Sequence, residues 1–120
     1  EAKQVIEPRD FEGETFVSLS AGSTSRHLID QAFNRGDIRR MQRIETNLSE
    51  IMCGMVSSGL GVGICDPFTA REFATRGIVV RPFVPRIDFE FAAVFPVQHS
   101  PSPVALDLVE TLRLALQGLG

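Results

Sequence analysis

The side chains that could carry out bond chemistry cluster between residues 23 and 30. Ser23 and Ser25 offer hydroxyl nucleophiles, and His27 and Asp30 have the three-residue spacing that lets two side chains meet on a helix. However, the Gly-x-Ser-x-Gly turn that exposes a nucleophilic serine is absent from the sequence. The apolar positions of this segment also leave His27 and Asp30 near its polar side. We therefore expect a solvated pair rather than a catalytic group.

A second candidate is the glycine run Gly59-Leu60-Gly61-Val62-Gly63, which invites a nucleotide-binding interpretation. A phosphate cradle needs a strand, then the glycines, then a helix whose N-terminus faces the anion. Here a helical stripe precedes the glycines and a short apolar segment follows them. The helix end near the glycines is its carbonyl end, which repels phosphate. We therefore expect a glycine that ends a helix and a strand packed closely against that helix.

Polar residues also follow three predicted strands at the points where those strands end. The candidate ligand contacts are Ser20, Gly22, Ser23 and Thr24 after the first strand, Thr46 after the second, and Asp66, Pro67 and Phe68 after the third. Ligands of open α/β sheets bind at such positions, and free backbone N–H groups there favour a carboxylate or another small anion. Ordinary helix caps would give the same pattern, so both interpretations stay open.

The elements that would position these residues alternate along the chain. We predict strands at 16–20, 40–45, 62–65, 78–83 and 89–97, and helices at about 24–35, 48–56, 67–76 and 103–119. Thr46-Asn47 and Asp66 are the predicted caps of the second and third helices, with Pro67 in the first helical position. The pattern indicates the α/β class, with a mostly parallel sheet flanked by helices. The 89–97 strand, apolar on both faces, should lie inside a sheet.

The composition limits the classes of function. The chain has 120 residues, 43% of them hydrophobic, which suffices for one small core. Its net charge is −3 and its Lys and Arg residues are scattered, so these residues alone make a poor nucleic-acid binder. No apolar run reaches the ~20 residues of a membrane span, and His99 has no second ligand at metal spacing. Cys53 and Cys65 lie in apolar surroundings, as reduced core thiols of a cytoplasmic protein do.

Several motifs occur in an order typical of one family. They are Pro8-Arg9-Asp10-Phe11-Glu12-Gly13-Glu14-Thr15-Phe16-Val17, Glu45-Thr46-Asn47, Met55-Val56-Ser57-Ser58-Gly59-Leu60-Gly61-Val62-Gly63-Ile64, Gly77-Ile78-Val79-Val80 with Pro82-Phe83, and Ser102-Pro103. In this order the chain resembles the second half of the effector-binding domain of LysR-type transcriptional regulators. The resemblance implies a periplasmic-binding-protein-like (type II) fold, in which two α/β subdomains joined by crossover strands hold an effector between them.

The resemblance also implies a division of the chain. Residues 1–15 would be a connector without a packed element, 16–85 effector-binding subdomain two, and 86–120 a crossover strand and helix returning to an incomplete subdomain one. The start without Met suggests a piece of a longer protein. The implied effector contacts fall on the loop after the first strand and on residues 66–68, where Asp66 would attract a cationic group or serve only as a cap.

The implied function is non-covalent sensing of a small metabolite that controls transcription, without enzymatic activity, cofactor or membrane contact. An amino acid, an opine or a small carboxylate would be the effector, and DNA would be bound only through an N-terminal domain outside these residues. Self-association is expected through the 89–97 strand and the last helix, or through the helix at 23–35. The alternatives are a solute-binding protein of the same architecture and a small hydrolase.

Overall fold

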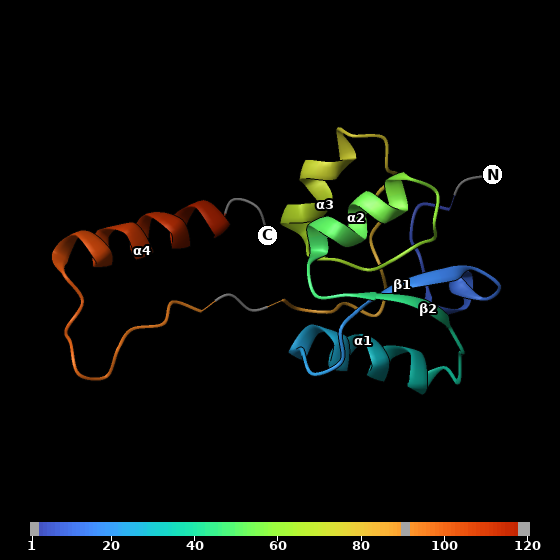
Figure 1. Cartoon of the computed structure of the whole chain (residues 1–120), viewed down its shortest axis with the longest axis horizontal. Coiled ribbons are helices and arrows are strands. Elements are labelled where there is room, and N and C mark those ends of the chain that lie inside the picture. The colour runs from blue at the N-terminus through green and yellow to red at the C-terminus, as the bar shows by residue number, and fades with distance from the viewer. Residues whose placement is uncertain (1–2, 90–91, 118–120) are drawn as a thin grey trace. The chain divides into compact units, whose positions relative to one another are not determined.

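A computed structural model describes residues 3–89 and 92–117 of the chain. The elements are η1 (Pro8–Phe11), β1 (Thr15–Leu19), α1 (Thr24–Arg35), β2 (Met41–Thr46), α2 (Ser49–Ser57), α3 (Pro67–Ala74) and α4 (Pro103–Gln117). The chain forms two compact units, residues 1–89 and residues 90–120. All elements except α4 belong to the first unit (Figure 1).

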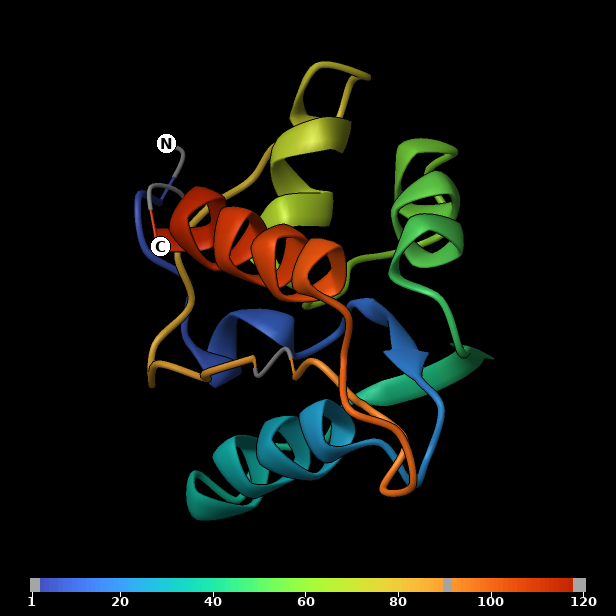
Figure 2. The same ribbon diagram turned by 90° about the vertical axis from the view of Figure 1, so that its left-hand side faces the viewer.

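The first unit has three layers. Its sheet consists of β1 and β2, which run parallel from the pair Thr15–Met41 to the pair Leu19–Thr46. Helix α1 lies on one side of this sheet, and α2 and α3 lie on the other, as Figures 1 and 2 show from two directions. The α/β class and the parallel pairing of the first two predicted strands are therefore confirmed.

The predicted strands at 62–65 and 78–83 are each reduced to one bridge. Val62 pairs in parallel with Phe16, with hydrogen bonds from Val17 N to Val62 O (2.8 Å) and from Val62 N to Thr15 O (2.9 Å). Phe83 pairs in parallel with Ile6. A strand needs a neighbour along its whole length, and these segments meet their neighbours at a single point. The sheet is thus smaller than the sequence predicts.

The predicted strand at 89–97 is wrong for its described residues. Phe89 and residues 92–97 have no strand conformation, while residues 90 and 91 lie outside the described part of the chain. Val94 and Val97 are exposed. The two-sided apolar pattern predicted a strand inside a sheet, but the described residues of this segment pair with no strand. Pattern alone does not supply the partner.

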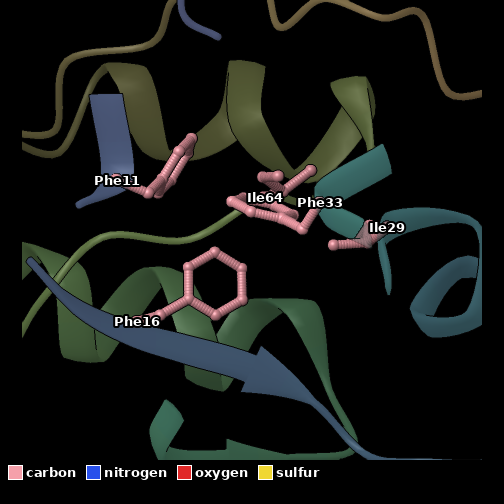
Figure 3. Close-up of a cluster of buried hydrophobic side chains, with 5 residues drawn as sticks. All are labelled: Phe11, Phe16, Ile29, Phe33 and Ile64. Carbon is pink, nitrogen blue, oxygen red and sulfur yellow. The ribbon is translucent and has the colours of Figure 1, made fainter. Parts of the chain in front are cut away.

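Two clusters of buried side chains form the core, one on each face of β1. Because side chains alternate along a strand, Phe16 points to the α1 side while Val17 and Leu19 pack with Met52 of α2. The first cluster contains Phe11, Phe16, Ile29, Phe33 and Ile64 (Figure 3). In this way the apolar stripes of α1 and α2 are both covered.

The prediction of an unpacked connector at residues 1–15 is wrong for Phe11. This side chain ends the short helix η1 and is 6% exposed. Its ring meets Phe16 and Phe33 edge-on, with centroids 5.5 and 5.4 Å away. One aromatic residue among many polar ones gives no periodic signal, so the sequence pattern did not mark it. Phe11 makes the N-terminal segment part of the core.

The glycine run ends a helix and packs closely, as predicted. Gly59 follows α2 with φ +82°, and Gly61 lies against β1, where a Cβ atom would be 2.4 Å from the Thr15 carbonyl oxygen. A Cβ at Gly63 would be 2.7 Å from the sulfur of Met52. The absence of side chains therefore lets residues 61–63 lie directly between β1 and α2.

The second unit consists of α4 and the segment before it. The Ser102 hydroxyl accepts a hydrogen bond from Ala105 N (3.2 Å) at the start of α4. Helix α4 has leucines at 106, 108, 112 and 114 that are all more than half exposed, and none of its described residues is buried. None of the helices in the described ranges combines the length and the hydropathy needed to cross a bilayer.

Candidate functional site

The three predicted ligand loops leave the sheet at the same edge. Since β1, β2 and the bridge at Val62 are all parallel, their carboxyl ends point the same way. Residues 20–24 lead into α1, residues 46–48 into α2 and residues 66–68 into α3 (Figure 1). We call these three segments the carboxyl rim. The three loops therefore lie at one edge, and the eight contact residues stay a prediction.

The first two loops of the carboxyl rim are joined by a backbone hydrogen bond from Ser20 N to Thr46 O (2.8 Å). Ser23 is the N-cap of α1, and its hydroxyl oxygen accepts from Arg26 N (3.1 Å). Gly22 has φ +97°, a conformation that glycine adopts without strain. Ser23 and Thr24 are exposed at the start of α1, whereas Ser25 and Arg26 are partly buried.

The third loop is a tight helix start. The Asp66 carboxylate accepts from Thr69 N (2.9 Å) and from the Thr69 hydroxyl (2.9 Å), and Pro67 occupies the first helical position. The predicted cap is therefore confirmed. Both carboxylate oxygens contribute to it, which favours the structural role of Asp66 over attraction of a cationic ligand. Phe68 is half-buried on the first turn of α3.

The predicted cap at Thr46-Asn47 is wrong. The N-cap of α2 is Leu48, which gives no side-chain cap. Thr46 is the buried last residue of β2, and its hydroxyl accepts a long hydrogen bond of 3.4 Å from Leu48 N. The strand continues one residue further than predicted, so the hydroxyl that would have capped the helix instead braces the turn before it.

Arg26 connects the strand ends at the carboxyl rim, and the sequence analysis did not predict this role. Its Nη1 donates to the Leu19 carbonyl (2.8 Å) at the end of β1 and to Glu45 Oε1 (2.9 Å) near the end of β2. Its Nε donates to both oxygens of Asp30 (3.0 Å each). One guanidinium therefore links β1, β2 and α1 immediately beside Ser20 and Thr46. The Arg26–Asp30 spacing of four residues is the signal that could have found half of this arrangement.

Asp30 also accepts from Arg40, whose side chain is 5% exposed. The Arg40 guanidinium lies over the Phe33 ring (4.3 Å to the centroid) and the Phe16 ring (5.0 Å). Burial alone would raise the pKa of Asp30, but hydrogen bonds from Arg40 and Arg26 lower it below its usual value. Asp30 is thus an ionised anchor between two arginines.

The expectation of a solvated His27–Asp30 pair is therefore wrong. Asp30 is partly buried and bound to arginines, while the exposed ring of His27 contacts Gln31 (Nε2 to Nε2, 3.2 Å). Arg40 lies ten residues from Asp30 in the sequence, so helical spacing does not reveal it. A carboxylate held by two arginines does not orient a histidine base. The described residues also contain no group of three or more His, Cys, Asp or Glu side chains placed to hold a metal.

A cavity of the first unit lies beside the carboxyl rim rather than on it. It has a volume of about 790 Å³ and lies among α2, α3 and the segments 62–65 and 78–83. Of the eight predicted contact residues, only Pro67 lines it. Its walls are mostly apolar and include Cys53 and Cys65. The predicted rim and the cavity are therefore separate features that meet at the start of α3.

Comparison with known proteins gives one family. A model described as the LysR substrate binding domain matches residues 1–117. The transcriptional activator protein LysR of Escherichia coli (strain K12) is 37% identical over 100 residues, which cover 83% of this chain and 32% of that protein. The regulatory protein NocR of Agrobacterium tumefaciens (strain T37) is 34% identical over 119 residues, which cover 99% of this chain and 40% of that protein. The chain therefore spans well under half the length of these relatives.

Proposed function

The chain belongs to the LysR substrate-binding domain family, and from this premise we propose that it is the effector-sensing part of a transcriptional regulator. Its role is to bind a small metabolite without transforming it. The observation that carries this proposal is the parallel register of β1, β2 and Val62, which collects the loops at 20–24, 46–48 and 66–68 on one edge. Loops at the carboxyl ends of parallel strands are the usual ligand position in α/β folds.

The chemistry of the carboxyl rim favours an anionic group on the effector. Ser23 and Thr24 are exposed at the start of α1, and the N-terminal end of a helix is its positive end, which favours a carboxylate. The hydroxyls of Ser20, Ser23 and Thr24 add donors at the same place. We propose that the effector is an amino acid, an opine or a small carboxylate. The proposed contacts on the carboxyl rim are Ser20, Gly22, Ser23, Thr24, Thr46, Asp66, Pro67 and Phe68.

The proposed mechanism is a shift between open and closed arrangements of two subdomains. In this proposal residues 16–85 are subdomain two of a periplasmic-binding-protein-like (type II) fold, and the segment 86–120 returns to subdomain one. An effector that contacts both subdomains binds the closed arrangement more tightly, and this difference in affinity changes the population of that arrangement. DNA binding is assigned to a part of the protein outside this sequence, in a cytoplasmic, self-associating regulator.

Titration calorimetry on the complete regulator tests the proposal, with α-amino acids, opines and dicarboxylates as ligands. Ser23→Gly removes the hydroxyl but keeps a residue that tolerates the N-cap position at a cost of only a few tenths of a kcal/mol. We expect it to weaken binding about threefold to tenfold, the effect of one lost hydrogen bond. Ser102→Gly, at the cap of α4, is the matched control and should leave affinity unchanged. Equal effects of the two changes, or no binding of any ligand, would refute the proposed site.

The two rival functions receive less support. A solute-binding protein would share the architecture, but the curated relatives are named as a transcriptional activator and a regulatory protein. A hydrolase acting from Ser23–Asp30 would need Asp30 beside His27, and Asp30 is bound to arginines instead. Binding of the complete protein to promoter DNA distinguishes the regulator from the solute-binding protein.

A further inference from the structure

The two cysteines of the chain, which are 12 residues apart in sequence, are brought together by the fold. Cys53 lies in α2, and Cys65 is in the segment that ends at Asp66. Their Sγ atoms are 3.6 Å apart. A disulfide requires a distance of about 2.05 Å, so the sulfurs would have to approach by about 1.5 Å. Rotations about the two Cα–Cβ bonds are the least costly way to close such a gap.

The pair is also accessible. Both side chains line the cavity among α2, α3 and the segments 62–65 and 78–83. Cys53 is 3% exposed, whereas Cys65 is partly exposed. Cys65 is therefore the more accessible of the two thiols to a small reagent in the cavity. A small reagent could not reach two thiols that were enclosed in a core without a cavity.

We propose that Cys53 and Cys65 form a redox-reactive dithiol site that closes to an intramolecular disulfide when the protein meets a small disulfide oxidant. The Cys65 thiolate attacks one sulfur of the reagent and releases a thiolate, which leaves a mixed disulfide on Cys65. Cys53 then attacks the Cys65 sulfur and releases the second half of the reagent. The two cysteine protons pass to the two released thiolates, and the two electrons leave with them. The redox step itself requires no effector, so this proposal does not rest on the proposed function.

The surroundings of the pair determine its pH dependence. Burial raises the pKa of both thiols, and the carboxylate of Asp66 acts in the same direction on each, with Glu50 adding to the effect at Cys53. Arg71 is a charged neighbour on the cavity wall. Because the thiolate is the attacking species, oxidation should be slow at neutral pH and become faster as the pH rises.

Disulfide formation would add a covalent link between α2 and the start of α3. Cys65 immediately precedes Asp66, the N-cap of α3, whereas Cys53 belongs to α2. A disulfide would fix the start of α3 to the middle of α2. The loop at 66–68 would then lose freedom to move relative to the rest of the unit.

The test is equilibration of the 120-residue chain with mixtures of oxidised and reduced dithiothreitol. The chain contains only two cysteines, so a thiol titration after denaturing quench has a simple scale. We expect loss of both thiols together, a mass decrease of two hydrogens per chain, and a peptide map that links residues 53 and 65. Retention of both thiols, or a bond between two chains, would overturn the proposal.

The same titration in guanidinium, which unfolds the chain, tests whether the fold brings the two thiols together. An unfolded chain also forms some disulfide, but without the fold the thiols meet only by chance. We expect the native chain to form the bond at a ratio of oxidised to reduced reagent about tenfold lower or more. Equal ratios in the two conditions would show that the fold does not favour the pair. This comparison uses the unmodified chain, so it does not depend on the folding of Cys53→Ser or Cys65→Ser.

Discussion

Arg26 shows at the scale of one residue how the fold holds its ligand loops. Its side chain is only 14% exposed, and its guanidinium is shared among the Leu19 carbonyl, Glu45 and Asp30. No other described side chain joins the ends of both strands to α1. Charged hydrogen bonds of this kind are stronger than neutral ones, and a carbonyl left without its donor carries a desolvation cost. The geometry of residues 20 and 46 should therefore depend on Arg26.

Arg26→Gln tests this dependence. The shorter amide cannot reach all three partners, so we expect the free energy of unfolding in urea to fall by about 1–3 kcal/mol. Arg43→Gln is the control, since Arg43 is exposed on β2. It should change stability by no more than about 0.5 kcal/mol. Similar losses for both variants would contradict a special role of Arg26.

Asp30 predicts how stability depends on acid. Its pKa is lowered in the folded chain by Arg40 and Arg26 despite partial burial. A carboxylate with a lowered folded pKa stabilises the fold fully above its unfolded pKa of about 3.9 and loses this contribution as the pH falls through the folded value. Urea unfolding measured between pH 7 and pH 2 should show a loss below about pH 4 that is smaller in Asp30→Asn. An unchanged pH profile would argue against the two-arginine anchor.

Asp66 is the residue whose two interpretations, ligand contact and helix cap, differ in their consequences. Since both of its oxygens bind Thr69, Asp66→Ala should lower the free energy of unfolding by about 1 kcal/mol, the usual cost of a lost cap. Glu72→Ala, at an exposed ion pair of α3, should cost less than about 0.5 kcal/mol. Chemical denaturation of both variants checks the difference, and an Asp66→Ala variant as stable as Glu72→Ala would remove the cap interpretation.

At the scale of elements, close backbone approach decides where the segment 61–63 lies. Gly61 has no room for a Cβ atom because the Thr15 carbonyl is backbone and moves only with β1. Gly54, within α2, has no atom of a neighbouring element within 4 Å of the place that a Cβ would occupy. Gly61 is therefore required for close packing against β1, whereas the space at Gly54 could hold a larger side chain.

Alanine substitution at each glycine tests this difference in packing. Gly61→Ala should destabilise the chain by about 1–3 kcal/mol through overpacking and should weaken the bridge between Val62 and Phe16. Gly54→Ala should stabilise it by up to about 1 kcal/mol, because alanine has the higher helix propensity. Thermal and urea unfolding of the pair give the answer. A stabilising Gly61→Ala would mean that the segment does not lie against β1.

At the level of the whole molecule, α4 carries exposed leucines that pack into no hydrophobic core. Leu108 and Leu112 lie four residues apart on one face and are 58% and 53% exposed. Contiguous exposed apolar surface of this kind favours association. We therefore expect the mass of the chain in light scattering to rise with concentration. Leu108→Glu combined with Leu112→Glu should return it towards the monomer, while Glu110→Gln should not. A monomer at all concentrations in the unmodified chain would contradict this expectation.

Sequence reasoning identified the order of most elements because periodicity and caps are local properties. The stripes of α1 and α2, the Asp66 cap and the tight glycine run all follow from residues within one turn or one loop of each other. It failed where a distant partner decides the outcome. The segments 62–65 and 78–83 have strand-like patterns but meet a neighbour at one point, and Phe11 is buried only because η1 brings it to Phe16 and Phe33.

Local patterns are enough to give the α/β class, the family resemblance and the three polar loops that follow strand-like segments. The contacts of Arg26 with the strand ends, of Asp30 with two arginines, and of Cys53 with Cys65 arise only when the chain folds. The difference lies in how far apart in sequence the interacting residues are. Helix periods and caps are set by residues a few positions apart, whereas ion pairs, aromatic contacts and thiol proximity depend on how the chain returns to itself in space.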